Sequence, residues 1–425
     1  MSHAKKLQRL FLLLGLSSMV FGRSAAAADH GKKLDEFLSQ GKLSDAQEYF
    51  RDIVAMNSGD DEARTAQGLT EFLIAIEQLG QANYRHGLIS QHAGNLPIAR
   101  LPIPTNAEPQ QISYARLHEI LADFQKRLAT SESTLADVKS GSVQIPLYIG
   151  RVRIDLDGNG KLAEDETLWK IFADINPGVK REQGEGFYIS VDGADVHWLR
   201  GYCNFLMAIC DVALAYDEKE LFEHCGQILF PKIESPYLVA KEVVKPENLY
   251  DAKMILDAVA AIHLAKFPLV DKGKMASAHA HLLVMIEQSR LCWAKANAEM
   301  DDDHEWIPNP DQTGVLQIRV SREIVTGWTK VLDELEAILQ GKKLIPYWRK
   351  YATGIFREPE FPEKGTGINL KRVFLEPRDF DLVLTIQGSN VEPYLEEGPL
   401  STPQAWEEMR RVFRGQFFGF AIWFN

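Results

Sequence analysis

The residues best suited to chemistry lie in one short segment that is rich in side-chain oxygen atoms. Asp155, Asp157 and Asn159 occupy alternate positions, Gly160 follows them, and Glu166 closes the segment. Proteins bind hard cations such as calcium with about six to eight oxygen atoms in a flexible shell. Glycine permits the sharp turn that folds a chain around an ion. The pattern therefore predicts a cation site rather than an ordinary acidic turn.

The segment 155–166 resembles the calcium-binding loop of the EF-hand family at every defining position. The resemblance implies that calcium is the bound ion. The ligands that it implies are Asp155, Asp157, Asn159, Lys161 and Glu166. The first three would supply side-chain oxygens, the fourth its backbone carbonyl, and the last both carboxylate oxygens. Ala163 has no side-chain oxygen, so we expect a water at the ninth position.

The surroundings of the loop differ from those of the family. EF-hand loops follow a helix, whereas residues 143–154 are rich in β-branched and aromatic residues and contain Pro146. Phe187–Val191 has the same character, so we expect a short strand pair on either side of the loop. A second loop of this pattern is absent from the sequence. These departures favour a structural calcium clamp over a sensor that opens a groove.

Asp192, Asp195 and His197 form a second group of side chains that could take part in catalysis. One interpretation is a hydrolase-like site, in which calcium supports the fold and His263 adds a further group. The other is helix capping, because an N-terminus favours one acid as the cap and another in the first turn. We favour capping. The acidic run Asp301–Glu305 is interpreted in the same way, as a solvated loop in preference to a second cation site.

Sequence motifs of enzymes are absent elsewhere. The chain has no GxSxG, HExxH, CxxCH, phosphate-loop or dinucleotide-binding pattern. His279 and His281 lie two residues apart, so on a helix they would face different directions and make no zinc pair. These absences favour a binding or structural protein, although enzyme sites also assemble from scattered residues.

Helical periodicity dominates the elements that must position these groups. Residues 34–79 contain Gly41, Ala46 and Phe50, a turn, and then Ala63 and Gly68. This order resembles a tetratricopeptide repeat, although position 58 carries serine where that repeat usually has proline. Stable arrays need at least three units and a third is not found. An ordinary helical hairpin is the alternative interpretation.

The sequence patterns of the rest of the chain predict helices with small β elements. Apolar stripes predict helices at 112–130, 199–216 and 324–339. Alternating apolar residues at 380–386 predict a strand, 419–424 predicts a closing strand, and Thr402 with Pro403 predicts a helix start. We expect a mainly α, multi-helix protein with a short β pair beside the calcium loop and a small α+β C-terminal region. The expected segments are a signal peptide at 1–28, a helical hairpin at 29–93, a Pro-rich linker at 94–110, a helical domain at 111–345 and the α+β region at 346–425.

The N-terminus predicts export. A basic start at Lys5 and Lys6 precedes an apolar run at 10–22 and four alanines ending at Ala28, as in a cleavable signal peptide. Loss of residues 1–28 removes four basic residues and no acid, which takes the formal charge from −12 to −16. Such a charge repels nucleic acid and anionic lipid. We expect a periplasmic or secreted protein without a membrane span, whose partner is a protein or peptide.

After the predicted export, four cysteines would lie in an oxidising compartment: Cys203, Cys210, Cys225 and Cys292. Up to two disulfides are compatible with the sequence, and so are four buried thiols. Residues seven positions apart on one helix lie about 10 Å from each other, so Cys203 and Cys210 are not expected to pair. The expectation for the whole chain is an exported calcium-binding protein that acts as a structural or protein-interaction scaffold.

Overall fold

A computed structural model describes residues 30–89, 101, 103–139, 143–161, 163, 166–170, 184, 186–239, 252–315, 319–352 and 361–414. The expected signal peptide at 1–28 and the expected strand at 419–424 lie outside the described residues. The described part is mainly helical with a few short antiparallel strands, which confirms the predicted fold class. None of its helices combines the length and the apolar character that crossing a membrane requires.

The N-terminal part forms three consecutive helices. Residues 30–39 are helical, and α2 (Leu43–Met56) and α3 (Asp61–His86) follow. The Asp60 carboxylate accepts a hydrogen bond from Ala63 N at 3.0 Å and so caps α3. Gly87 ends the helix with φ +70°, the left-handed conformation that glycine adopts most readily. Both helical stripes predicted in this region are confirmed, and the relation to tetratricopeptide repeats stays a prediction.

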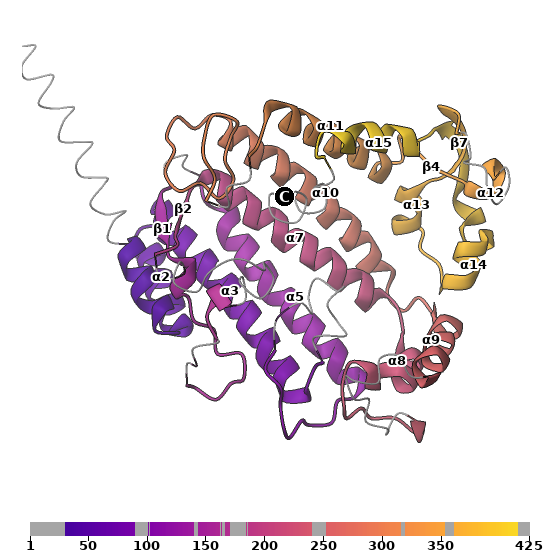
Figure 1. The fold of residues 1–425 in the computed structure, drawn as a ribbon, viewed down its shortest axis with the longest axis horizontal. Coiled ribbons are helices and arrows are strands. Elements are labelled where there is room, and N and C mark those ends of the chain that lie inside the picture. The colour runs from indigo at the N-terminus through magenta and orange to yellow at the C-terminus, as the bar shows by residue number, and fades with distance from the viewer. Residues whose placement is uncertain are drawn as a thin grey trace, which may run out of the picture.

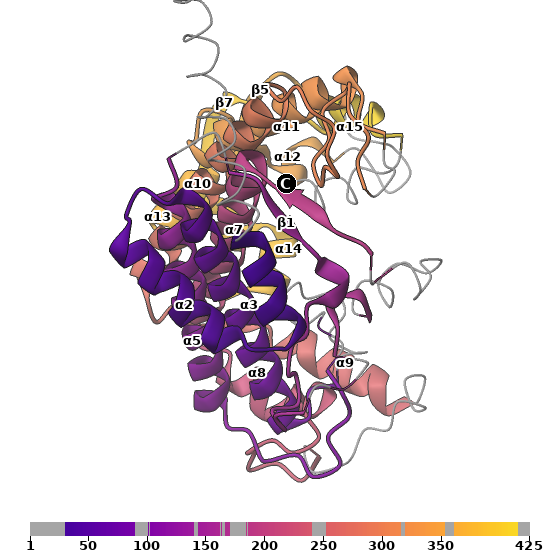
Figure 2. The same cartoon turned by 90° about the vertical axis from the view of Figure 1, so that its left-hand side faces the viewer.

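A row of long helices forms the body of the protein. Its further members are α5 (Tyr114–Ala136), α7 (Gly193–Ala215), α10 (Lys272–Ala296) and α11 (Arg322–Leu339). Successive members pack side by side in the order α2, α3, α5, α7, α10, α11 (Figure 1). Figure 2 shows α2, α3 and α5 lying next to one another from a second direction. The helices predicted at 112–130, 199–216 and 324–339 are confirmed by α5, α7 and α11.

Short elements lie near the C-terminal end of α7. They are α8 (Lys219–Cys225), the 3-10 turn η4 (Gly226–Ile228), α9 (Ala252–Leu264) and β3 (Lys266–Phe267). Tyr216, which follows α7, pairs with Leu269 just beyond β3. The C-terminal end of α7 is thereby tied to the segment that follows α9.

The predicted strand pair on either side of the calcium loop is confirmed. β1 (Ile145–Leu147) and β2 (Ile189–Val191) pair antiparallel, with Pro146 opposite Ser190. The 3-10 turn η2 (Ile149–Arg151) follows β1 and leads toward the loop. The chain therefore approaches residue 155 through strand and 3-10 turn rather than through a helix.

The C-terminal region mixes small strands and helices. The strands β4 (Ile345–Pro346), β5 (Lys364–Ile368) and β7 (Leu395–Pro399) form one antiparallel sheet in the order β4-β5-β7. The remaining elements are α12 (Trp348–Tyr351), α13 (Leu370–Leu375), β6 (Phe380–Asp381), α14 (Leu382–Gln387), η7 (Ser389–Tyr394) and α15 (Pro403–Arg411). The predicted start of a helix at Thr402 and Pro403 is confirmed, because the Thr402 hydroxyl accepts from Ala405 N.

The strand predicted at 380–386 is wrong beyond its first two residues. The Asp381 carboxylate accepts from Leu384 N at 2.8 Å, which caps a helix, and Gly388 ends that helix with φ +109°. Alternation over so few residues does not separate a strand from one helical turn. The two end signals, an acidic cap and a glycine stop, outweighed the apolar alternation here.

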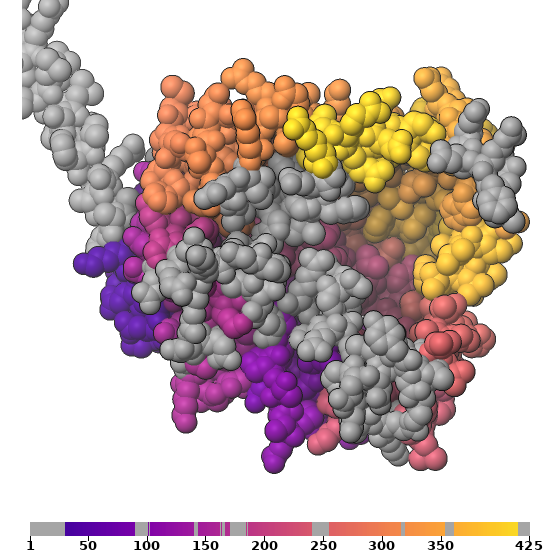
Figure 3. Space-filling view, viewed as in Figure 1, coloured from indigo at the N-terminus to yellow at the C-terminus, as the bar shows by residue number. Residues whose placement is uncertain are grey.

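The buried core runs through most of the described chain. One cluster includes Leu34 near the N-terminus, Ile154 beside the loop, Val331 on α11 and Phe413 after α15. In the space-filling view, residues of the α11 region (orange) and α15 (yellow) form one edge of the molecule (Figure 3). The core therefore crosses the segment boundaries expected at 93, 110 and 345.

All four cysteines are buried and free, so the structure contains none of the disulfides that the sequence allowed. The absence of a Cys203–Cys210 bond confirms that prediction. Burial raises the pKa of the Cys203 and Cys210 thiols to about 12, which keeps both in the unreactive protonated form.

We predict that a chromogenic disulfide reagent labels none of the thiols in the folded protein. After denaturation without a reductant, all four cysteines should react, because each is a free thiol in the folded state. The absorbance of the released reagent measures both numbers. Fewer than four reactive thiols in denaturant would contradict the free-thiol assignment.

Candidate metal centre

The two ends of the candidate calcium loop are joined by backbone hydrogen bonds. Ile154 N donates to Glu166 O at 3.0 Å, and Leu168 N donates to Val152 O at 2.9 Å. Arg153 and Thr167 form an antiparallel bridge between these two bonds. Both ends of the loop are therefore fixed before any ion binds.

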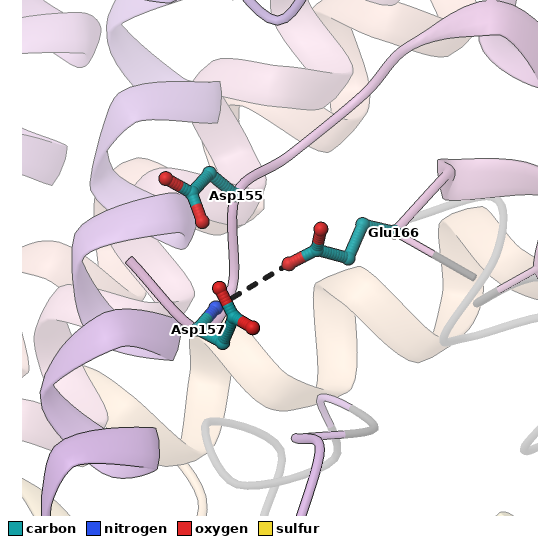
Figure 4. Close-up of side chains that lie close together, drawn as sticks. All are labelled: Asp155, Asp157 and Glu166. Atoms are coloured by element: carbon teal, nitrogen blue, oxygen red, sulfur yellow. Dashed lines mark hydrogen bonds between the residues drawn. The ribbon is translucent and has the colours of Figure 1, made fainter. Parts of the chain in front are cut away.

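Three of the predicted ligands come together within the loop. Carboxylate oxygens of Asp155, Asp157 and Glu166 lie within 4.8 Å of one another, and Figure 4 shows the side chains clustered at the turn. Glu166 is only 2 % exposed, whereas both aspartates are partly exposed. The site therefore has one buried carboxylate at its base and two closer to solvent.

Backbone amides of the loop orient the aspartates. Asp155 accepts from Gly158 N at 2.8 Å and from Gly160 N at 3.0 Å. Asp157 accepts from Asn159 N at 2.9 Å. Gly160 has φ +71° and nothing lies within 4 Å of the position where its Cβ would be, so the backbone conformation alone explains the glycine. The sharp turn predicted at Gly160 is thereby confirmed.

Glu166 accepts hydrogen bonds through both oxygens. Oε1 accepts from Leu156 N at 2.9 Å and from Asp157 N at 3.4 Å, and Oε2 accepts from Ala163 N at 2.9 Å. These donors hold the carboxylate across the loop. These three bonds use three of the about four acceptor positions of a carboxylate, and the position that remains is on Oε2.

The side chain of Asn159, a further predicted ligand, contacts this cluster, and Lys161, which is predicted to bind through its backbone carbonyl, lies two residues later. The Asn159 side chain donates to the Asp157 carboxylate at 2.6 Å and accepts from Lys161 N at 2.6 Å. Lys161 is exposed. A bound ion would require the Asn159 amide to turn its oxygen toward the carboxylates.

Three residues of α3 support the loop, and sequence reasoning missed all of them. The Glu77 carboxylate accepts from Asp155 N at 3.0 Å, and Gln81 Nε2 donates to Asp155 O at 2.9 Å. Between them, Gly80 leaves the space that Leu156 fills, since a Cβ there would lie 2.5 Å from Leu156 Cδ2. The sequence offered only one signal for these contacts. Within a helical segment, a glycine has one polar residue three positions before it and another directly after it.

The loop concentrates negative charge that no basic side chain pairs with among the described residues. Among the described residues, the three clustered carboxylates make no ion pair with a lysine or arginine side chain. Burial, together with the charges of Asp155 and Glu166, raises the pKa of Glu77 to about 7. A set of hard oxygen donors with uncompensated charge fits Ca²⁺, and a bound ion would stabilise the folded loop by removing the mutual repulsion.

The alternative site predicted from the sequence is not assembled. Asp192 and Asp195 form a capping box at the start of α7, which confirms the capping interpretation. His197 pairs through Nδ1 with Gln288 Oε1 at 2.8 Å. His263 lies on α9, beside the C-terminal end of α7, so about 30 Å of helix separate it from Asp192. His279 and His281 also contact different partners, Leu339 O and the Asn204 side chain.

Asp192 of the capping box instead belongs to a second group of carboxylates. Oxygens of Asp192, Glu299 and Glu305 lie within 4.8 Å of one another. Glu305 is 4 % exposed, so the prediction that residues 301–305 form a fully solvated loop is wrong at its last position. Burial raises the pKa of Glu299 to about 8 and that of Glu305 to about 7, and the charge of Asp192 adds to both shifts. Protons, rather than basic side chains, relieve the repulsion here.

No protein-family model matches the chain, and comparisons with curated proteins and with solved structures found no similar protein. The candidate metal centre therefore depends on its own geometry and on the resemblance of residues 155–166 to the EF-hand loop.

We predict that Gly80→Ala destabilises the protein and weakens calcium binding. Alanine in place of glycine inside a helix normally stabilises it by about 1 kcal/mol. At this position the new methyl group would displace Leu156 and shift the loop. Thermal melts in calcium, with calorimetric titration of calcium, measure both effects.

Gly201→Ala on α7 is the matched control, because the nearest atoms to its Cβ would be Gln288 Cβ at 3.4 Å and Met285 O at 3.7 Å, which are ordinary contacts. It should leave calcium affinity unchanged. Equal affinities for the Gly80→Ala and Gly201→Ala proteins would contradict the role assigned to the contact between α3 and the loop.

We also predict that stability falls as the pH rises from about 5 to about 8. Carboxyls whose pKa is raised by folding bind protons more tightly in the folded state, so their stabilisation is complete below the ordinary value of 4.5. It is lost as the pH passes through about 7 and about 8, the values for Glu305 and Glu299. Urea unfolding at constant free calcium measures this dependence.

The double variant Glu299→Gln/Glu305→Gln should reduce the pH-dependent loss by at least about 2 kcal/mol, since one pKa unit corresponds to about 1.4 kcal/mol and both pKa values lie more than two units above 4.5. Glu407→Gln, on the exposed side of α15, is the control and should keep the wild-type dependence. An unchanged slope in the double variant would show that these carboxyls titrate as they do in the unfolded chain.

Proposed function

We propose that the protein is an exported calcium-binding protein, in which one calcium ion clamps residues 155–166 and the protein serves as a structural or protein-interaction scaffold. The clustering of Asp155, Asp157 and Glu166 oxygens within 4.8 Å carries the proposal. Export rests on the signal-peptide pattern of residues 1–28.

The contacts of the loop support a clamp. Arg153 N donates to Leu38 O at 3.0 Å, Gln81 of α3 donates to Asp155 O, and the strands β1 and β2 flank the loop. Ile154 and Leu156 beside the carboxylates are buried, with 0 % and 1 % of their surface exposed. An ion held here would fasten the N-terminal helices to the strand pair and to the core.

The expected stabilisation is modest. EF-hand loops in extracellular modules bind calcium with dissociation constants of about 10⁻⁴–10⁻³ M. At ten times the dissociation constant, binding to the folded state adds about 1.4 kcal/mol to stability. An exported protein can meet calcium in this range, so the clamp would be engaged at its destination and released by a chelator.

We predict opposite effects of Asp155→Asn in calcium and in chelator. The amide keeps only one acceptor oxygen, so it can accept from Gly158 N or from Gly160 N but not from both, and it removes one of three clustered charges. In calcium, the variant should melt lower than wild type because it binds the ion more weakly. In chelator, it should melt at the same temperature or higher because less repulsion remains.

Glu407→Gln again provides a charge-matched control and should behave like wild type in both buffers. Calorimetric titration of the mature chain should show one calcium site in wild type and much weaker binding in Asp155→Asn. Equal melting temperatures of wild type with and without calcium would refute the clamp.

A further inference from the structure

We propose that a pocket between α3 and α5 binds phosphate, either as the free ion or as a phosphate monoester group. This inference goes beyond calcium binding and does not depend on it. The pocket is lined by residues of both helices and has a volume of about 170 Å³.

The lining combines an apolar floor with a cationic rim. Leu79 of α3 and Ile120 and Phe124 of α5 are buried and close the bottom. The arginines of the rim are Arg85, Arg116 and Arg127. Guanidinium groups offer paired donors that match the oxygens of phosphate, so three of them around one pocket form a plausible recognition surface.

The three arginines are available for a ligand. Within the described ranges, Arg85 and Arg127 make no ion pair with an acidic side chain. Arg116 pairs with Glu119 at 2.9 Å, but the Glu119 side chain is 64 % exposed, and such surface pairs contribute little. Burial lowers the pKa of His86, and the nearby charges of Arg116 and Arg85 lower it further.

The charge and the volume of the pocket together limit the class of ligand that it can bind. Three arginines and the single acid Asp123 give the lining a net charge of +2 in a chain whose formal charge is −12. The volume is below the roughly 300–1,000 Å³ of pockets that enclose drug-sized molecules. A small dianion, or the anionic end of a larger molecule, therefore fits best, and three guanidinium groups suit a tetrahedral oxyanion better than a planar carboxylate.

Asp123 favours phosphate over sulfate. A phosphate monoester, whose second pKa lies at about 6, is mostly unprotonated near neutral pH, but inorganic phosphate keeps at least one P–OH. That P–OH can donate to the Asp123 carboxylate, which lines the pocket. Sulfate has no proton to donate and would meet only repulsion from the same carboxylate.

The test is calorimetric titration of the mature chain with inorganic phosphate and with O-phosphoserine, in chelator so that calcium phosphate does not form. We expect saturable binding of at least one of these ligands. The double variant Arg85→Gln/Arg127→Gln should bind about ten- to a hundredfold more weakly, as expected for the loss of charged hydrogen bonds. The tighter ligand identifies the source as free phosphate or monoester.

Two comparisons give controls. Arg322→Gln removes an arginine whose side chain is 78 % exposed on another helix, and it should leave binding unchanged. Sulfate should bind more weakly than phosphate to wild type, and Asp123→Asn should reduce that difference. Asp123 is an exposed residue, so this variant tests the site without disturbing the fold.

Three results would overturn the proposal. They are the absence of binding of both phosphate ligands, an equal loss of affinity in Arg322→Gln, and tighter binding of succinate than of either phosphate ligand. Circular dichroism of each variant confirms that the helices are intact before binding is compared.

Discussion

The close approach of α3 to its neighbours is the constraint on which the proposed sites depend. Two glycines permit it. A Cβ on Gly68 would lie 2.5 Å from Leu135 of α5, and a Cβ on Gly80 would lie 2.5 Å from Leu156 of the loop. Because these side chains fill the space that a methyl group would need, α3 contacts α5 and the loop at van der Waals distance. The calcium loop and the arginine pocket thus both depend on small residues of one helix.

The structure contains two groups of crowded carboxylates that reduce their repulsion in different ways. At 155–166, backbone amides orient the acids, two of which are partly exposed, and this cluster is the one proposed to hold calcium. Around Asp192, burial and a carboxyl–carboxyl hydrogen bond raise the pKa of Glu299, so a proton can supply the missing positive charge. The two groups differ in their surroundings: backbone amides of a turn donate to the first group, whereas burial raises the pKa of Glu299 and Glu305 in the second.

Local patterns in the sequence predicted much of the fold. Helical stripes identified α3, α5, α7 and α11, and the loop spacing identified the cluster of Asp155, Asp157 and Glu166. The caps of α7 and α15 followed from residues adjacent in sequence. The strand predicted at 380–386 failed because seven residues carry too little periodic signal to outweigh an N-cap and a glycine stop.

Such local patterns did not predict contacts between residues that are far apart in the sequence. Glu77 and Gln81 bond to a residue more than seventy positions away, and Glu299 and Glu305 meet Asp192 only through the packing of α10 against α7. The arginine rim likewise joins two helices, each of which shows an unremarkable mixture of charges along its own sequence. One sequence without homologues gives no information on such pairs, so only the three-dimensional structure reveals them.

Gln81 connects the two proposed sites. Its amide donates to Asp155 O at 2.9 Å, and the same side chain lines the arginine pocket. A cation in the loop and an anion in the pocket attract each other, and Gln81 lies between them as a shared polar contact. Any coupling between the two ligands must be reciprocal, because each can change the affinity of the other only by the same factor. The loop and the pocket are therefore proposed as neighbouring sites of opposite charge, the first in contact with α3 and the second lined by it.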